Sequence, residues 1–179
     1  MLHQVHFITI LYSGRIISKL VFTWMMQKKQ LELTLAVLKP GLASYPPRLL
    51  KVLTQIRKED FEIVQQRTIH WRQDDAAAFY AEHKDRFFYN RLVTFMSSGP
   101  MVALILAKEN AVKDWRALLG PTKSYKARQT DPSSLRALYG LSDTRNAAHG
   151  SDSVETAIKE MKYFFPDFEA DEWYERHIS

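Results

Sequence analysis

The 179-residue chain contains no cysteine, which excludes disulfides, thiolate zinc sites, iron–sulfur clusters and a cysteine nucleophile. It also lacks any uninterrupted apolar run approaching the ~18 residues of a membrane-spanning helix, so no membrane span is expected. Internal repeats and low-complexity tracts are absent as well. With 46% hydrophobic and 25% charged residues, the chain has the composition of an intracellular globular protein with one compact domain.

Acidic residues are missing from the first 31 positions, which contain Arg15, Lys19, Lys28 and Lys29. The formal net charge is +5, and removing these four cations leaves 21 basic against 20 acidic residues in the rest of the chain. A nucleic-acid-binding domain carries its positive charge on the folded face that neutralises phosphates. Because the surplus lies in the leader instead, we expect no nucleic-acid partner.

Residues 1–29 form an apolar, basic leader whose role has three interpretations. A secretory signal requires positive charge before its apolar run, but here residues 5–12 precede the first arginine. The composition favours a mitochondrial targeting segment. The alternatives are a disordered tail or a translated stretch upstream of a start at Met25 or Met26, which would leave the protein cytoplasmic. In each case we expect the leader to be dispensable for folding.

After the leader, hydrophobic spacing predicts strands alternating with helices. Strands are expected at residues 31–38, 61–69, 101–107 and, more briefly, 144–148. Helices are expected at residues 47–58, 74–82, 87–96, 110–119, 134–139 and 151–165. Residues 120–133 are predicted to be a polar loop. This alternation predicts an α/β or α+β sandwich built on one sheet.

The turn before the last predicted helix contains the most informative histidine. Gly150 allows a tight turn, and Ser151 or Asp152 can cap the helix that follows. His149 therefore lies at a helix N-terminus, where backbone N–H groups and the helix dipole favour anions. Glu160 follows about three helical turns later and could orient the imidazole, which would make it a competent nucleophile. The alternative is a polar turn with a solvated histidine.

Four cations stand singly at the ends of predicted elements: Lys39, Arg116, Arg136 and Arg145. Each alone is most simply a solvated surface charge, but together around a nucleophilic histidine they would form a polyphosphate clamp. No GxGxxG, HExxH or EF-hand pattern is present, and the run at residues 120–124 lacks the glycine that a Walker A loop has before its lysine. Without a dedicated metal cage, any metal would arrive with the phosphates, as Mg²⁺ commonly does.

Taken together, several motifs resemble those of the nucleoside diphosphate kinase family, in the same order and spacing over residues 31–165. They are Leu38-Lys39-Pro40, Phe95-Met96-Ser97-Ser98-Gly99-Pro100, Leu119-Gly120-Pro121-Thr122, and Arg145-Asn146 followed by His149-Gly150-Ser151-Asp152-Ser153. Within the family, the chain is most similar to the nucleoside diphosphate kinase 6 subgroup. This similarity rests on Arg86-Phe87-Phe88-Tyr89, a longer loop after Thr122, and Phe164-Phe165-Pro166-Asp167-Phe168. The subgroup is associated with mitochondria, which favours the targeting interpretation of the leader.

The resemblance implies a fold and a domain division. The fold would be a ferredoxin-like βαββαβ sandwich of the α+β class, with a four-stranded antiparallel sheet covered by helices. The kinase domain would span residues 30–168, between the leader at 1–29 and a C-terminal tail at 169–179.

The resemblance also implies an activity, the transfer of the γ-phosphoryl group of a nucleoside triphosphate to a nucleoside diphosphate, with Mg²⁺ carried by the phosphates. His149 would form the phosphohistidine and Glu160 would steady it. The residues implied to hold the phosphates and stabilise the transferring group are Lys39, Tyr80, Arg116, Thr122 and Arg136. Asn146 with Lys39 would meet the ribose, and Phe88 would stack on the base, which suits broad nucleoside specificity because every base has a π-face.

Two departures from the family pattern stand out. Gly41 follows Lys-Pro where the family usually has Asp, and we expect at most a change in stability. The loop from Thr122 to Arg136 is about three residues longer than in hexameric members, where it contributes to the trimer contact. The hexamer is therefore doubtful. The longer loop also leaves an alternative function, that of a nucleotide-binding or scaffold subunit whose phosphotransfer is weak or depends on a protein partner.

Overall fold

The computed structural model of the chain describes residues 31–178. The predictions about the leader fall outside these residues and stay predictions. The strands are β1 (Leu31–Leu38), β2 (Glu62–Ile69), β3 (Met101–Glu109) and β4 (Ala148–Gly150). The helices are α2 (Pro40–Ala43), α3 (Pro46–Lys58), α4 (Gln73–Phe79), the short η1 (Ala81–His83), α5 (Tyr89–Met96), α6 (Ala111–Leu119), α7 (Ser124–Thr130), α8 (Leu135–Tyr139), α9 (Val154–Phe164) and α10 (Ala170–Ile178).

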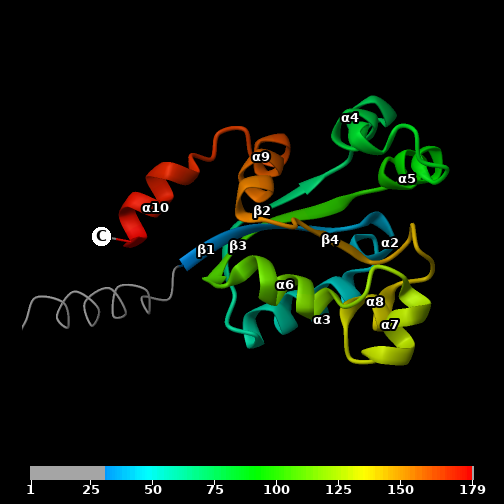
Figure 1. The fold of residues 1–179 in the computed structure, drawn as a ribbon, viewed down its shortest axis with the longest axis horizontal. Helices are drawn as coiled ribbons and strands as arrows, with labels where there is room; N and C mark the ends of the chain where they lie inside the picture. The colour runs from blue at the N-terminus through cyan, green and yellow to red at the C-terminus, as the bar shows by residue number, and fades with distance from the viewer. Residues whose placement is uncertain (1–30, 179) are drawn as a thin grey trace, which may run out of the picture. The chain divides into compact units, whose positions relative to one another are not determined.

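The four strands form one antiparallel sheet in the order β2-β3-β1-β4. β1 pairs with β3 along its whole length, from Leu31 opposite Glu109 to Leu38 opposite Val102. On its other edge, β1 pairs with β4 only over Ala36–Leu38. This arrangement confirms the ferredoxin-like α+β fold expected from the sequence (Figure 1).

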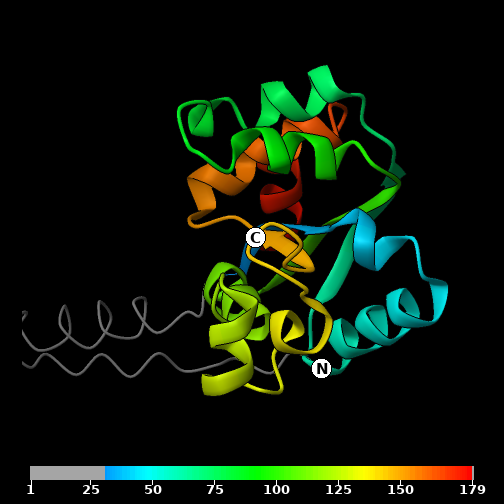
Figure 2. The ribbon, with the colours of Figure 1, turned by 90° about the vertical axis from the view of Figure 1, so that its right-hand side faces the viewer.

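Helices cover both faces of the sheet, with α4, α5 and α9 on one face and α3 and α6 on the other (Figures 1 and 2). Successive side chains of a strand point to opposite faces. In β1, Leu33, Leu35 and Val37 therefore pack in the core beneath α9, while Ala36 and Leu38 pack in the core on the α3 and α6 side. Coverage on both faces explains why β1 and β3 are almost continuously apolar.

Three local predictions were wrong in part. The fourth strand begins at Ala148, not at residue 144, because Ala147 has a φ of 70° and this left-handed conformation interrupts extended pairing. The predicted polar loop at 120–133 contains α7, whose buried face consists of the small residues Ser124 and Ala127 and so gives no hydrophobic periodicity. Residues 40–43, for which no helix or strand was expected, form α2, because proline is tolerated in the first turn of a helix.

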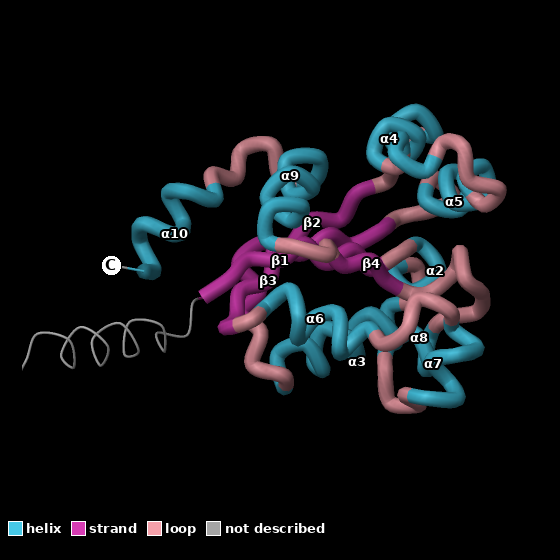
Figure 3. Tube along the Cα trace, viewed as in Figure 1, coloured by secondary structure: helices cyan, strands magenta, loops and turns pink. Residues whose placement is uncertain are grey.

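The C-terminal segment is part of the described fold. Most of the region assigned to a tail at 169–179 forms α10, and Trp173 is buried in the same core as α9. The hydroxyl of Tyr174 accepts a hydrogen bond from the backbone N–H of Leu33 at 3.0 Å. α10 thus covers the part of the β1 edge that β4 does not reach (Figure 3).

Candidate active site

The backbone of His149 is fixed by β4 and by one tryptophan. His149 pairs with Val37 of β1, and the indole N–H of Trp115 on α6 donates to the His149 carbonyl oxygen at 3.1 Å. A Cβ at Gly150 would lie 2.6 Å from Trp115 Cδ1 and Nε1, so only glycine allows this close approach. The sequence therefore places the histidine at a rigid strand end beside α6.

The imidazole of His149 is held by the carboxylate of Glu160 on α9. Nε2 lies 3.1 Å from Oε1 and 3.0 Å from Oε2, and the hydroxyl of Ser151 donates to Oε2. Both side chains are mostly covered, at 22% and 17% exposure. A carboxylate accepts a hydrogen bond, so this contact favours a hydrogen on Nε2 and leaves Nδ1 facing away from Glu160. The contact fixes the orientation of the imidazole.

The helix after His149 is capped by a different residue from those predicted. The side chain of Ser153, not Ser151 or Asp152, accepts the hydrogen bond from the Thr156 N–H at 3.1 Å. Ser151 instead supports Glu160, a role that its position in the turn did not reveal. The Glu160 carboxylate is thus positioned by α9, which carries it, and by Ser151, which follows β4 and donates a hydrogen bond to it.

Lys39, at the end of β1, is a buried cation next to other cations. Its side chain is held by Asn146, whose Oδ1 accepts from Lys39 Nζ at 2.7 Å. The amide of Asn146 in turn donates to the Thr122 carbonyl oxygen at 3.2 Å. Burial and the nearby charge of Arg136 lower the pKa of Lys39 from 10.5 to about 7. Lys39 and Asn146, which were expected to meet the ribose together, thus lie in direct contact.

Arg136 and Arg116 complete a group of cations around Lys39. Arg136 donates to the carbonyl oxygens of Gly120 at 2.8 Å and Ala148 at 3.3 Å. Burial and the charge of Arg116 lower the pKa of Arg136 from 12.5 to about 10. Among residues 31–178, none of the three cations forms an ion pair with a carboxylate. Such mutual repulsion would be relieved by a polyvalent anion.

Tyr80 and Arg136 each present a buried donor that lacks a partner within the described residues, the Tyr80 hydroxyl and the Arg136 Nε. Burial and the charge of Glu160 raise the pKa of Tyr80, so its hydroxyl stays protonated and can donate. Buried polar groups in proteins are almost always hydrogen-bonded. An anion with several acceptor oxygens would satisfy both donors.

Phe88 lies at the start of α5 and is connected to the histidine side by two ring contacts, the first stacked and the second edge-to-face. The Tyr80 and His83 rings are 6.2 Å apart, and the His83 and Phe88 rings are 5.7 Å apart. Phe88 is half-buried, so one part of its ring is open to a ligand. Its position suits base stacking at some distance from the phosphate-binding cations.

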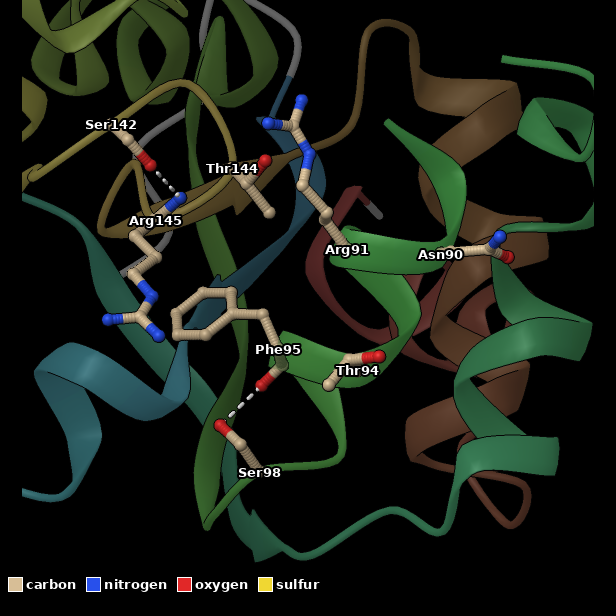
Figure 4. Close-up of a pocket in the computed structure, with 8 residues that line it drawn as sticks. All are labelled: Asn90, Arg91, Thr94, Phe95, Ser98, Ser142, Thr144 and Arg145. Carbon is tan, nitrogen blue, oxygen red and sulfur yellow. Dashed lines mark hydrogen bonds between the residues drawn. The ribbon is translucent and has the colours of Figure 1, made fainter. Parts of the chain in front are cut away.

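Arg145 lies away from the other three cations with which the sequence grouped it. It lines a cavity of about 430 Å³ between α5 and the loop before β4, and its guanidinium carbon lies 5.6 Å from the centre of the Phe95 ring (Figure 4). We call this cavity the arginine pocket. Its lining residues are Asn90, Arg91, Thr94, Phe95, Ser98, Ser142, Thr144 and Arg145.

No cluster of three or more histidine or carboxylate side chains suited to a metal ion occurs in residues 31–178. Apart from the Glu160 carboxylate, the groups assigned to this site are cations, an amide and hydroxyls, which suit phosphate. Over the same residues, no helix is long and apolar enough to cross a membrane.

Comparisons with known proteins agree with the fold and the motifs. A family model described as nucleoside diphosphate kinase matches residues 32–170. The chain is 52% identical over 145 residues to nucleoside diphosphate kinase 6 of Danio rerio, covering 81% of this chain and 82% of that protein. It is 50% identical over 145 residues to the Homo sapiens protein of the same name, covering 81% and 78%.

A solved structure gives the same result for the fold. The Aquifex aeolicus nucleoside diphosphate kinase aligns with a TM-score of 0.72 and 39% sequence identity, covering 76% of this chain and 96% of that one. At this identity the similarity extends beyond the fold to the sequence.

Proposed function

The chain belongs to the nucleoside diphosphate kinase family, and on this basis we propose that it transfers the γ-phosphoryl group of a nucleoside triphosphate to a nucleoside diphosphate through a phosphohistidine on His149. The observation that carries the proposal is the contact of His149 Nε2 with the Glu160 carboxylate, at 3.0 and 3.1 Å. It leaves Nδ1 as the nucleophile, on an imidazole that is mostly buried.

In the first half-reaction, the Nδ1 lone pair forms a bond to the γ-phosphorus. The bond from that phosphorus to the bridging oxygen breaks, and the nucleoside diphosphate leaves with the electron pair. The proton on Nε2 stays in place, and Glu160 stabilises the positive charge that develops on the ring. In the second half-reaction, a terminal phosphate oxygen of the acceptor attacks the same phosphorus and Nδ1 regains its lone pair.

Around the histidine, Lys39, Arg116 and Arg136 supply positive charge, while Tyr80 donates a hydrogen bond. Phosphoryl transfer needs positioning and charge stabilisation more than acid–base chemistry, and these groups can provide both. Mg²⁺, held by the nucleotide phosphates, would supply further charge neutralisation. Thr122, whose carbonyl oxygen binds Asn146, would place its hydroxyl near the same phosphates.

The alternative is a nucleotide-binding or scaffold subunit with weak or partner-dependent transfer. It is supported by the longer loop, which here carries α7. Incubating the isolated protein with ATP labelled on the γ-phosphate separates the two functions. Acid-labile, base-stable labelling that a nucleoside diphosphate removes supports the enzyme, whereas nucleotide binding without labelling supports the alternative.

Proton uptake by Lys39 gives a prediction about pH. Because its pKa is about 7 in the free protein, Lys39 loses its proton as pH rises above 7, and a bound polyphosphate should raise that pKa again. Affinity for Mg·ADP should therefore fall as pH rises from 7 to 9, by up to about tenfold per pH unit. Calorimetry in buffers of different ionisation enthalpy should detect uptake of a proton on binding.

Two lysine variants test this origin of the pH dependence. Lys39→Met should bind Mg·ADP more weakly and lose the pH dependence of binding, whereas Lys51→Met, at an exposed position on α3, should retain both the affinity and its pH dependence.

Lys39 also makes the stability of the folded protein depend on pH. Between pH 7 and 10.5 the unfolded chain holds this proton and the folded chain does not, so its contribution to stability rises with pH over that range. If Lys39→Met kept the pH dependence of Mg·ADP affinity or of stability seen in the unmodified protein, Lys39 would not be its origin.

The longer loop gives a prediction about assembly. Of the three cations at residues 123–131 of this loop, Arg128 is used inside the subunit, where it donates to the Gly140 carbonyl oxygen at 2.9 Å. Lys123 and Lys126 are exposed, and burying them without partners would cost several kcal/mol each. We expect sedimentation at micromolar concentration to show a species smaller than a hexamer. A stable hexamer at that concentration would contradict this prediction.

A further inference from the structure

The charged side chains that line the arginine pocket are both cationic. Two guanidinium groups face it from opposite walls, Arg91 from α5 and Arg145 from the loop before β4, and no carboxylate lines it. Figure 4 shows Arg91 extending from α5 toward Thr144, and Arg145 extending from the loop past the ring of Phe95. Arginine donates hydrogen bonds and accepts none, so a ligand here must present acceptors.

The pocket adjoins both proposed contacts of the nucleoside. On one wall, the Arg91 guanidinium carbon lies 5.6 Å from the centre of the Phe87 ring, which is 5.5 Å from the ring of Phe88. On the other wall, Arg145 directly precedes Asn146, whose side chain binds Lys39. A base stacked on Phe88, with its ribose near Asn146, would therefore bring one edge to this pocket.

The bases differ at the edge that arginine recognises. Guanine presents O6 and N7 as two neighbouring acceptors, which match the two donors of one guanidinium group. Adenine replaces O6 with an amino group, whose hydrogens face the guanidinium donors and repel them. We propose that Arg91 and Arg145 select nucleotides whose base carries a carbonyl group at this edge, 6-oxopurines above all, over those with an amino group there. This inference rests on the proposed function, because it assumes that the site binds nucleotides.

Gly41 places no acidic side chain beside Phe95, which lines the pocket. A Cβ at position 41 would lie 3.6 Å from Phe95 Cζ, at ordinary contact distance, and the Arg145 guanidinium carbon lies 5.6 Å from the centre of the same ring. An acidic side chain at this position would bring a carboxylate close to Arg145 and compete with a base for it. The departure noted in the sequence at Gly41 thus keeps Arg145 available to a ligand.

The test measures equilibrium binding of GDP, IDP and ADP, each with Mg²⁺, to the full chain. IDP is the decisive probe, because it has the oxygen at position 6 but lacks the 2-amino group of guanine. GDP and IDP should bind about fivefold to tenfold more tightly than ADP. In Arg91→Ala and Arg145→Ala the preference should fall to within about twofold, mainly through weaker binding of GDP and IDP.

Two further variants control the test. Arg48→Ala removes another exposed arginine that lies over an aromatic ring, 5.2 Å from the centre of Tyr45, and should leave the preference unchanged. Gly41→Asp should reduce the preference although both arginines remain. Equal affinities for the three nucleotides, or a preference retained in both arginine variants, would overturn the inference and leave the proposed function standing. Absence of binding by all three nucleotides would overturn both.

Discussion

Replacing His149 with alanine should abolish phosphoryl transfer while nucleotide binding stays within about threefold of the unmodified protein. The transfer is lost because, among the described residues, no other side chain next to Glu160 can replace His149 as the nucleophile. Ser151 donates a hydrogen bond to the same carboxylate, but a carboxylate is too weak a base to activate a serine hydroxyl effectively. Binding should persist because Lys39 and Arg136 would meet the phosphates independently of the imidazole. The measurement is labelling from γ-labelled ATP followed by a diphosphate chase, with binding titrated in parallel.

Glu160→Gln is the matched comparison for that result. The amide keeps the shape of the carboxylate but cannot stabilise a developing positive charge, so transfer should slow by about tenfold to a hundredfold without stopping. Undiminished labelling of His149→Ala would show that the nucleophile lies elsewhere. Loss of binding together with labelling would show that His149 maintains the structure of the site.

Gly120→Ala should lower the free energy of unfolding by about 3 kcal/mol or more. Gly120 has a φ of 73° and a ψ of −174°, a region that residues with a side chain rarely adopt. A Cβ there would also fall 2.5 Å from Ser134 Cβ. For a chain of this size, the melting temperature should fall by roughly 6–12 °C. Thermal and urea denaturation of the full chain measure the change.

Gly41→Ala is the control for the glycine effect. Its Cβ would meet Phe95 at 3.6 Å, an ordinary contact, and its position lies in the short helix α2. Alanine there should leave stability unchanged or raise it slightly, because it restricts the unfolded chain. Equal melting temperatures for Gly120→Ala and the unmodified protein would mean that the turn after α6 relaxes without cost. Arg136, which binds the Gly120 carbonyl oxygen, would then also be free to move.

The sequence was most informative where one pattern determines one structure. The apolar runs predicted β1 and β3 because both faces of these strands are covered, and the resemblance predicted a four-stranded antiparallel sheet. Glu160 was predicted to orient His149, and the two side chains are in contact, although the interval between them is not three helical turns: α9 begins only at Val154, so Glu160 lies in its second turn. Local periodicity and motif resemblance were sufficient for these features.

Features that depend on packing across the chain were missed. α7 was missed because its buried residues, Ser124 and Ala127, are small, so its helix face carries no stripe of large apolar side chains. Arg145 was grouped with the phosphate cations by its place in the chain, but the left-handed Ala147 turns the backbone between it and His149. Ser151 was considered only as a cap, because its partner Glu160 lies nine residues away on the helix.

The shortness of β4 gives the C-terminal helix a protective role. β4 pairs with β1 only over Ala36–Leu38, so among residues 31–178 no strand lies beside the first half of this β1 edge. An open edge with free N–H groups is a template for pairing with another chain, which leads to aggregation. Tyr174 contacts that edge with a hydroxyl bonded to the Leu33 N–H, and Trp173 anchors the helix in the core. We expect this side chain, which cannot itself extend the sheet, to hinder self-association through β1.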